Sequence, residues 1–175
     1  FDVDVINENL EGSNFALADL SAANFFMTWM PCSNFAYVDL FSANMEQATL
    51  FGSNFTSANL QGSNFERANL RSSNFDSANL QGTNFAGADL AMSNFCEAKL
   101  SDANFENANL SDTNLLCVRM YRANLEGADL SYSNLSHTIL NDTNLKGANL
   151  YGVNIDRTSF DNATWDRETV WPEGF

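Results

Sequence analysis

Positive charge is scarce in this sequence, because only 8 lysines and arginines stand against 22 aspartates and glutamates and leave a formal net charge of -14. A surface of that sign repels nucleic acid and anionic membranes and attracts basic proteins, although it can also serve solubility alone. No apolar run approaches the roughly 18 residues of a membrane helix. We therefore expect no membrane span and no direct nucleic-acid binding.

Cysteine is limited to Cys32, Cys96 and Cys117, an odd number that does not suit a disulfide framework. The chain has a single histidine, His137, and 2 prolines. Since the first residue is Phe1 and not Met, removal of an N-terminal targeting segment is compatible with the sequence. The compartment stays open between the cytoplasm and, after such a removal, the periplasm or thylakoid lumen.

A five-residue period organises almost the whole chain. From Phe15 to Trp165 every fifth residue is large and apolar, and the residue two places before it is small or compact. The residue between these two is mostly Asn or Asp, whereas the other two positions vary freely, as solvent-facing positions do. A period of five fits neither an α-helix nor a simple strand, so we interpret the repeat as a coil whose faces are each five residues long.

The number of faces follows from the alternation of Phe and Leu by tens, as at Phe55, Leu60, Phe65 and Leu70. An even number of faces stacks each residue type on its own kind in the next coil, whereas three faces would place Phe on Leu. Two faces enclose no interior, and six would leave a hollow that close-packed proteins avoid. The sequence therefore predicts an all-β solenoid of about eight coils with four faces and about 20 residues in each coil.

Because residues 20 apart stack on one another, the sequence also predicts columns of asparagine, one through Asn54, Asn74 and Asn94 and another through Asn64 and Asn84. Neighbouring coils lie about 4.8 Å apart, as hydrogen-bonded strands do. At that spacing identical amides can hydrogen-bond along the column and identical aromatic rings can stack. The regular spacing of these residues is therefore explained by the stability of the fold and does not by itself indicate a function.

A solenoid needs a cap at each end, since each coil contacts only its neighbours. We predict an N-terminal cap over residues 1–9, a β-helix over 10–167, and an aromatic C-terminal tail over 168–175 that covers the last coil.

The segment from Ser53 to Gly62, Ser-Asn-Phe-Thr-Ser-Ala-Asn-Leu-Gln-Gly, resembles the pentapeptide-repeat family, whose consensus unit is Ala-(Asp/Asn)-Leu-x-x. The resemblance extends over nearly the whole chain and implies a right-handed quadrilateral β-helix. The ending from Trp171 to Phe175 is similar to the endings of cyanobacterial and plastid members of unassigned role.

Another branch of this family, the quinolone-resistance proteins, binds DNA gyrase by mimicking DNA with an acidic rod. Those proteins share a C-terminal dimerisation helix and often loops that interrupt the coils, and this sequence shows neither. A charge of -14 along about 40 Å of rod is one charge per roughly 3 Å, against one per about 1.7 Å for duplex DNA. Because of these differences, a DNA mimic that binds gyrase or another topoisomerase is the alternative hypothesis and not the leading one.

One outward column carries Glu46, Glu66, Glu106 and Glu126, with Ala86 in the gap. Like charges stacked at this spacing repel one another, so the column costs stability unless solvent screens it or a cationic partner uses it. We take these four glutamates as a candidate interaction surface.

A second candidate surface is the outward apolar group Phe26, Met27 and Trp29, with Ile6 in the coil below. Clusters of this kind mark an interface or a site for a covering segment. Packing under the N-terminal cap and self-association through that end both stay open.

The side chains of Cys96, Cys117 and His137 are expected on neighbouring coils. Two cysteines so placed are within reach of a disulfide, and a cysteine beside a histidine is compatible with a minor metal-binding or redox role. Against this, a flat solenoid face offers no concave pocket, and no signature at metal-ligand spacing is present. We expect no catalytic residue, no metal site and no cofactor.

The leading hypothesis is a non-enzymatic structural or interaction protein that presents an acidic rod to a protein partner of unknown identity. We expect it as a monomer or an end-to-end dimer.

Overall fold

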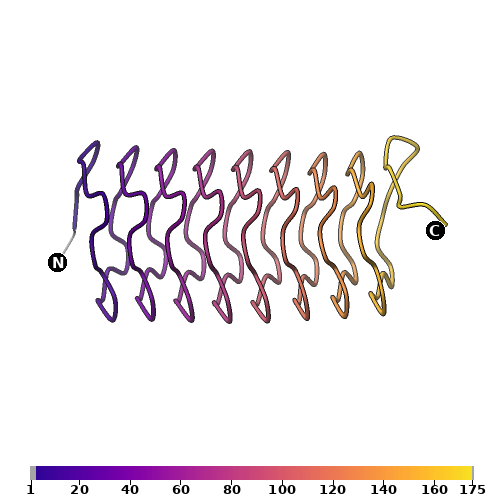
Figure 1. Ribbon diagram of the computed structural model, residues 1–175, viewed down its shortest axis with the longest axis horizontal. Coiled ribbons are helices and arrows are strands. Elements are labelled where there is room, and N and C mark those ends of the chain that lie inside the picture. The colour runs from indigo at the N-terminus through magenta and orange to yellow at the C-terminus, as the bar shows by residue number, and fades with distance from the viewer. Residues whose placement is uncertain (1–2, 175) are drawn as a thin grey trace.

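The computed structural model describes residues 3–174, which wind into one rod of stacked coils with the two ends of the chain at opposite ends of the rod (Figure 1). Within these residues the chain forms no helix, and hence none that could cross a membrane. Each face pairs with the neighbouring coils through a single residue in a parallel β-bridge, and the bridges join residues 20 apart, from Asp4 with Asn24 to Asn144 with Thr164. The fold is a right-handed quadrilateral β-helix, as predicted.

The corners between faces are tight turns with one residue in the left-handed backbone region. At one such corner the N–H of Ala58 donates to the carbonyl of Phe55 at 3.0 Å, while the N–H of Ser57 donates to the next coil at 2.9 Å. Ser57 has a φ of 55°, and Gly62 at the following corner has a φ of 68°. Glycine adopts this conformation without the steric cost of about 1–2 kcal/mol that other residues meet, which explains its recurrence at this position.

The interior of the rod is filled by the large residues of the repeat. Phe55, Leu60, Phe65 and Leu70 are all completely buried, so the predicted convergence of the four faces is confirmed. Phe55 and Phe75 stack face to face with ring centroids 4.9 Å apart, and Phe55 meets Phe65 edge-on at 5.9 Å. Stacking along each face and edge contacts between faces together close-pack the core.

Small inward residues pack between the large ones without leaving polar groups unpaired. The hydroxyl of Ser73 donates to the carbonyl of Leu50 in the preceding coil at 2.9 Å, and the hydroxyl of Ser53 donates to that of Met30 at 3.1 Å. Among residues 3–174 every fully buried side-chain nitrogen or oxygen has a hydrogen-bond partner. The hydrogen bonds of buried serine and threonine therefore offset the desolvation of their hydroxyls, and some of them, such as those of Ser73 and Ser53, link two coils.

The predicted asparagine columns form hydrogen-bonded ladders. The column from Asn44 to Asn144 is continuous, whereas in the other the Nδ2 of Asn74 donates to the hydroxyl of Thr56 at 2.9 Å instead of to Asn54. The Nδ2 of Asn94 donates to the Oδ1 of Asn74 at 2.9 Å, and the Nδ2 of Asn114 donates to the Oδ1 of Asn94 at 2.8 Å. The same Oδ1 of Asn94 accepts the backbone N–H of Cys96 at 3.2 Å. Each amide thus joins two coils and also fixes the turn that follows it.

The C-terminal end departs from the strict repeat. Trp165 was expected to point into the interior, yet its side chain is 49% exposed, because it lies in the last coil and no further coil covers it. One extra residue follows, since Asn149 bridges Val170, 21 residues on. Trp171 then packs against the core and meets Trp165 edge-on at 5.5 Å.

At the N-terminal end the described residues continue the ladder. Asp4 bridges Asn24, so residues 3–9 already follow the path of a coil. Residues 1 and 2 of the predicted N-terminal cap and residue 175 of the predicted tail lie outside the described residues. The cap over 1–9 and the tail over 168–175 stay predictions.

Candidate interaction surfaces

The four glutamates of the predicted surface extend from one column of turns, which we call the acidic column: Glu46, Glu66, Glu106 and Glu126. The asparagine ladder beneath positions them, since the backbone N–H of each glutamate donates to the Oδ1 of the asparagine two residues before it, at 3.1 to 3.3 Å. The backbone of the acidic column is therefore as rigid as the ladder.

The carboxylates of the acidic column have few partners within the described chain. Glu106 and Glu126 are exposed, and the Oε2 of Glu126 accepts the Nδ2 of Asn144 at 2.8 Å. Glu66 lies 3.7 Å from the guanidinium of Arg67, a loose and largely solvated ion pair. Much of the negative charge is thus available to a ligand.

A shallow hollow interrupts the acidic column where the sequence has Ala86 and Gly87 in place of longer side chains. Glu66 lies on one side of the hollow and Glu106 on the other. The lining residues are Glu66, Arg67, Asn84, Ala86, Gly87, Asn104, Glu106 and Asn107. A lysine or arginine of a partner can enter this gap and reach carboxylates of two different coils.

The apolar group Phe26, Met27 and Trp29 lies on the surface of the N-terminal coils. Met27 and Trp29 are 48% and 44% exposed, and Ile6 is 40% exposed. The described residues 3–9 leave these side chains partly exposed, and packing under the N-terminal cap over 1–9 stays a prediction. Residues 3–9 leave them exposed because this segment follows the path of a coil and pairs within the ladder.

Sequence reasoning missed the partners of two surface aromatics. Trp29 meets Phe51 edge-on at 6.1 Å, and its Nε1 donates to the Oε2 of Glu11 at 3.4 Å. Tyr132 meets Tyr151 edge-on at 5.5 Å. In both pairs the two residues are close to one coil length apart along the chain, and that spacing is the signal that could have identified them.

The cysteines show no sign of a metal centre. All three are free thiols, and no group of three His, Cys, Asp or Glu side chains that could hold a metal ion occurs between residues 3 and 174. The pKa of Cys96 is raised above its ordinary value, first by burial and then by the charges of Asp76 and Glu97. The metal-binding alternative at Cys96, Cys117 and His137 therefore has no ligand set within this part of the chain.

An exposed ion pair lies on another face, where the guanidinium of Arg122 donates to both carboxylate oxygens of Asp102 at 2.7 Å. This hydrogen bonding holds the pKa of Asp102 below its ordinary value of 3.8. Because the pKa is lower in the folded chain, the pair contributes stability above the unfolded-state pKa, and this contribution is lost as the pH falls through the folded-state pKa.

We expect Arg122→Gln to raise the pKa of Asp102 towards its ordinary value, measured by ¹³C NMR titration of the carboxyl carbon. The control is Arg157→Gln, which removes the loose pair with Asp156 at 3.9 Å and should leave Asp102 unchanged. An Asp102 that titrates identically in all three proteins would show that the pair does not form.

Comparison with solved structures finds the same architecture in several proteins, including HetL and QnrB1. HetL, involved in heterocyst differentiation regulation in the cyanobacterium Nostoc, is 23% identical, with 99% of this chain and 91% of that chain covered and a TM-score of 0.53. A trypsin-treated form of QnrB1, a plasmid-mediated fluoroquinolone resistance protein, is 16% identical, with 95% and 92% covered and a TM-score of 0.79. At these identities the likeness shows the fold alone. Comparison with the curated proteins gives no match.

Comparison with protein families gives a match to pentapeptide repeats, in 8 copies. The matched segments are 18–56, 33–71, 53–90, 78–115, 88–127 and 128–164. They cover most of the coils in which the large and small inward residues alternate. The chain belongs to the pentapeptide-repeat family.

Proposed function

We propose that this protein is a non-enzymatic interaction protein whose acidic column binds a basic surface of a protein partner. The observation that carries the proposal is the row of Glu46, Glu66, Glu106 and Glu126 on a rigid ladder, with a hollow between Glu66 and Glu106. Stacked carboxylates repel one another, and a partner that supplies positive charge relieves this repulsion as it binds.

A rigid backbone favours binding of a partner to the acidic column. The backbone beneath each glutamate is held by the ladder and by the asparagine two residues before it, so little backbone freedom is lost on binding. The net charge of -14 also attracts a basic protein from a distance and speeds the encounter. Binding of this kind should weaken steeply as salt is added.

A lysine decapeptide titrated into ¹⁵N-labelled protein tests the proposal. We expect the largest amide shifts along the acidic column, and a dissociation constant at least about tenfold weaker when its four glutamates are replaced by glutamine. The matched control removes four exposed acids elsewhere: Glu8→Gln, Glu97→Gln, Asp112→Asn and Glu173→Gln. Equal weakening by the two quadruple variants would mean that net charge alone, and not the column, attracts the peptide.

The natural partner can be sought with the same pair of variants. Affinity capture from the source cells should retain a basic protein on the wild type and on the control variant and lose it on the acidic-column variant.

A second candidate function is mimicry of DNA towards gyrase or another topoisomerase. It is supported by the likeness of fold to QnrB1, a fluoroquinolone resistance protein, and by the acidic rod. Supercoiling assays with purified gyrase, with and without this protein and a quinolone, test it. Absence of both inhibition and protection at micromolar protein would remove this candidate.

A further inference from the structure

One ladder of the rod is interrupted by two positive charges. In this column the Nδ2 of Asn59 donates to the Oδ1 of Asp39 at 2.9 Å, and the Nδ2 of Asn79 donates to the Oδ1 of Asn59 at 3.2 Å. The next two places are taken by Lys99 and Arg119, which bridge each other directly. Two cations therefore stack directly after Asp39, Asn59 and Asn79, and Ile139 follows them in the same column.

The two cations are not neutralised within the described part of the chain. Five of the 8 lysines and arginines lie in ion pairs, whereas Lys99 and Arg119 are exposed and belong to none of these pairs. The backbone is stretched where they stack, since the N–H of Arg119 reaches the carbonyl of Ala98 at 3.4 Å, against 3.0 Å for the N–H of Lys99 to Ala78. Their mutual repulsion is a cost that an anion would remove.

The presence of Lys99 and Arg119 at these two positions also leaves two backbone N–H donors without a side-chain acceptor. Earlier in this column the Oδ1 of Asp39 accepts the N–H of Phe41, two residues further on, at 3.0 Å, and the Oδ1 of Asn59 accepts that of Gln61 at 3.5 Å. Lysine and arginine side chains have no acceptor, so the N–H groups of Ser101 and Tyr121 have no acceptor among residues 3–174. Two backbone donors thus accompany the two cations at the same two turns.

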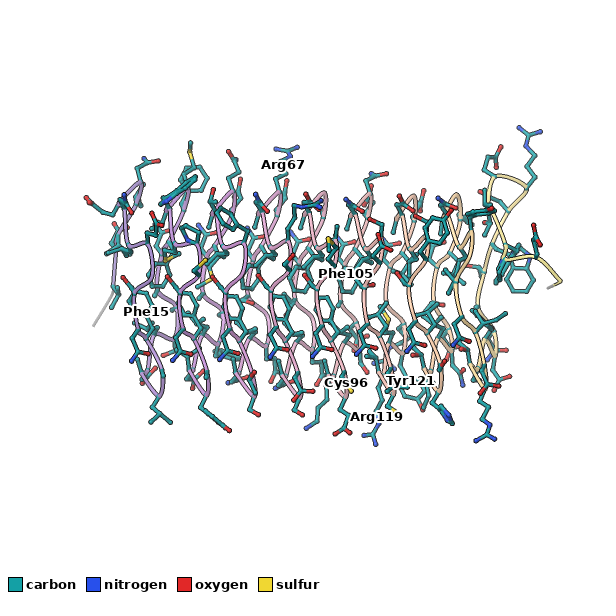
Figure 2. All side chains as sticks on the ribbon, viewed as in Figure 1. Phe15, Arg67, Cys96, Phe105, Arg119 and Tyr121 are labelled. Carbon is teal, nitrogen blue, oxygen red and sulfur yellow. The ribbon has the colours of Figure 1, made fainter. Side chains whose placement is uncertain are left out.

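The two cations border a shallow hollow lined by Glu97, Lys99, Cys117 and Arg119. Ser101 and Tyr121 lie two residues beyond each cation and outside that lining. Figure 2 shows Arg119 and Tyr121 along one edge of the rod, opposite the edge that carries Arg67 beside the acidic column. Glu97 is the one carboxylate in the lining and forms no ion pair within the described residues. At physiological salt the charges of the acidic column on the far edge are largely screened, because the Debye length is about 8 Å.

We propose that Lys99 and Arg119, with the N–H groups of Ser101 and Tyr121, bind a diphosphate group. An oxygen of each phosphoryl unit takes the place of the missing amide oxygen at one turn, accepts the free N–H there and pairs with the cation beside it. Successive turns lie about 4.8 Å apart, so two linked phosphoryl units match two turns better than one orthophosphate does. This site is separate from the acidic column and binds an anionic ligand, whereas the acidic column binds a cationic one.

Titration of ¹⁵N-labelled protein with sodium pyrophosphate, with ADP in a second arm, tests this site. We expect saturable amide shifts centred on Ser101 and Tyr121 in both arms, with weaker binding of orthophosphate. Equal affinity in the two arms would identify the diphosphate alone as the ligand, and tighter binding of ADP would identify a nucleoside diphosphate.

The test variant combines Lys99→Asn and Arg119→Asn, which restore the residue typical of the repeat and should leave the fold intact. We expect this variant to bind pyrophosphate at least tenfold more weakly. The control Lys146→Asn removes another exposed cation and should bind as the wild type does. Unchanged binding by the double variant, or shifts reproduced by sodium chloride at equal ionic strength, would overturn the proposal.

Discussion

Replacing Phe75 with alanine is expected to lower the free energy of unfolding by about 3–5 kcal/mol. The ring is completely buried and lies between Phe55 at 4.9 Å and Phe95 at 4.7 Å, nearly parallel to both. Removing it leaves a cavity that the coils cannot close, because the hydrogen-bonded ladders fix the spacing between them. Urea denaturation followed by circular dichroism measures the change.

The control for this substitution is Phe41→Ala, at a turn position where the ring is 47% exposed. It removes the same atoms from the surface and should change the free energy of unfolding by no more than about 0.5 kcal/mol. Similar losses in the two variants would mean that Phe75 does not fill the interior.

Replacing Asn94 with alanine is expected to lower the free energy of unfolding by about 1.5–4.5 kcal/mol, since three hydrogen bonds are lost at about 0.5–1.5 kcal/mol each. These are the amide bonds to Asn74 and Asn114 and the bond from the N–H of Cys96. The side chains of Asn74 and Asn114 each lose a partner, so the loss extends over three coils. Urea denaturation measures the effect, and hydrogen exchange of the Cys96 amide should accelerate.

The matched control is Thr49→Ala. Thr49 occupies the same bridge position on another face, between Trp29 and Asn69, but its hydroxyl makes no hydrogen bond within the described residues. We expect a change of about 0.5 kcal/mol or less. An Asn94→Ala variant as stable as Thr49→Ala would show that the amide column does not hold the coils together.

Much of the fold could be predicted because one physical constraint recurs at every unit. Each face must place one large and one small side chain inside the rod, so the positions of Phe55 and Leu60 in the sequence define both the interior and the number of faces. The Phe and Asn columns then follow from repetition alone, since residues 20 apart lie one above the other.

The ends were harder to predict, because there the constraint from a neighbouring coil disappears. Trp165 keeps the period of the repeat but is half exposed, and the shift to Val170 depends on a single extra residue. Nothing in the spacing of apolar residues distinguishes a residue in the last coil from one in the middle of the rod.

The placement of the acidic column could be predicted because residues 20 apart stack, and the outward position of Met27 and Trp29 follows from their places in the repeat unit. The contact of Trp29 with Phe51 and that of Tyr132 with Tyr151 depend on how neighbouring turns meet in space. Such contacts join different positions of the repeat unit, so a comparison of equivalent positions does not reveal them.

The central claim is that residues 20 apart stack in columns around a four-sided interior. Side-chain NMR tests this claim most directly. The account predicts nuclear Overhauser effects between the side-chain amides of Asn74 and Asn94, and between the rings of Phe55 and Phe75. Cross-peaks that instead join residues 15 or 25 apart along the chain would contradict it.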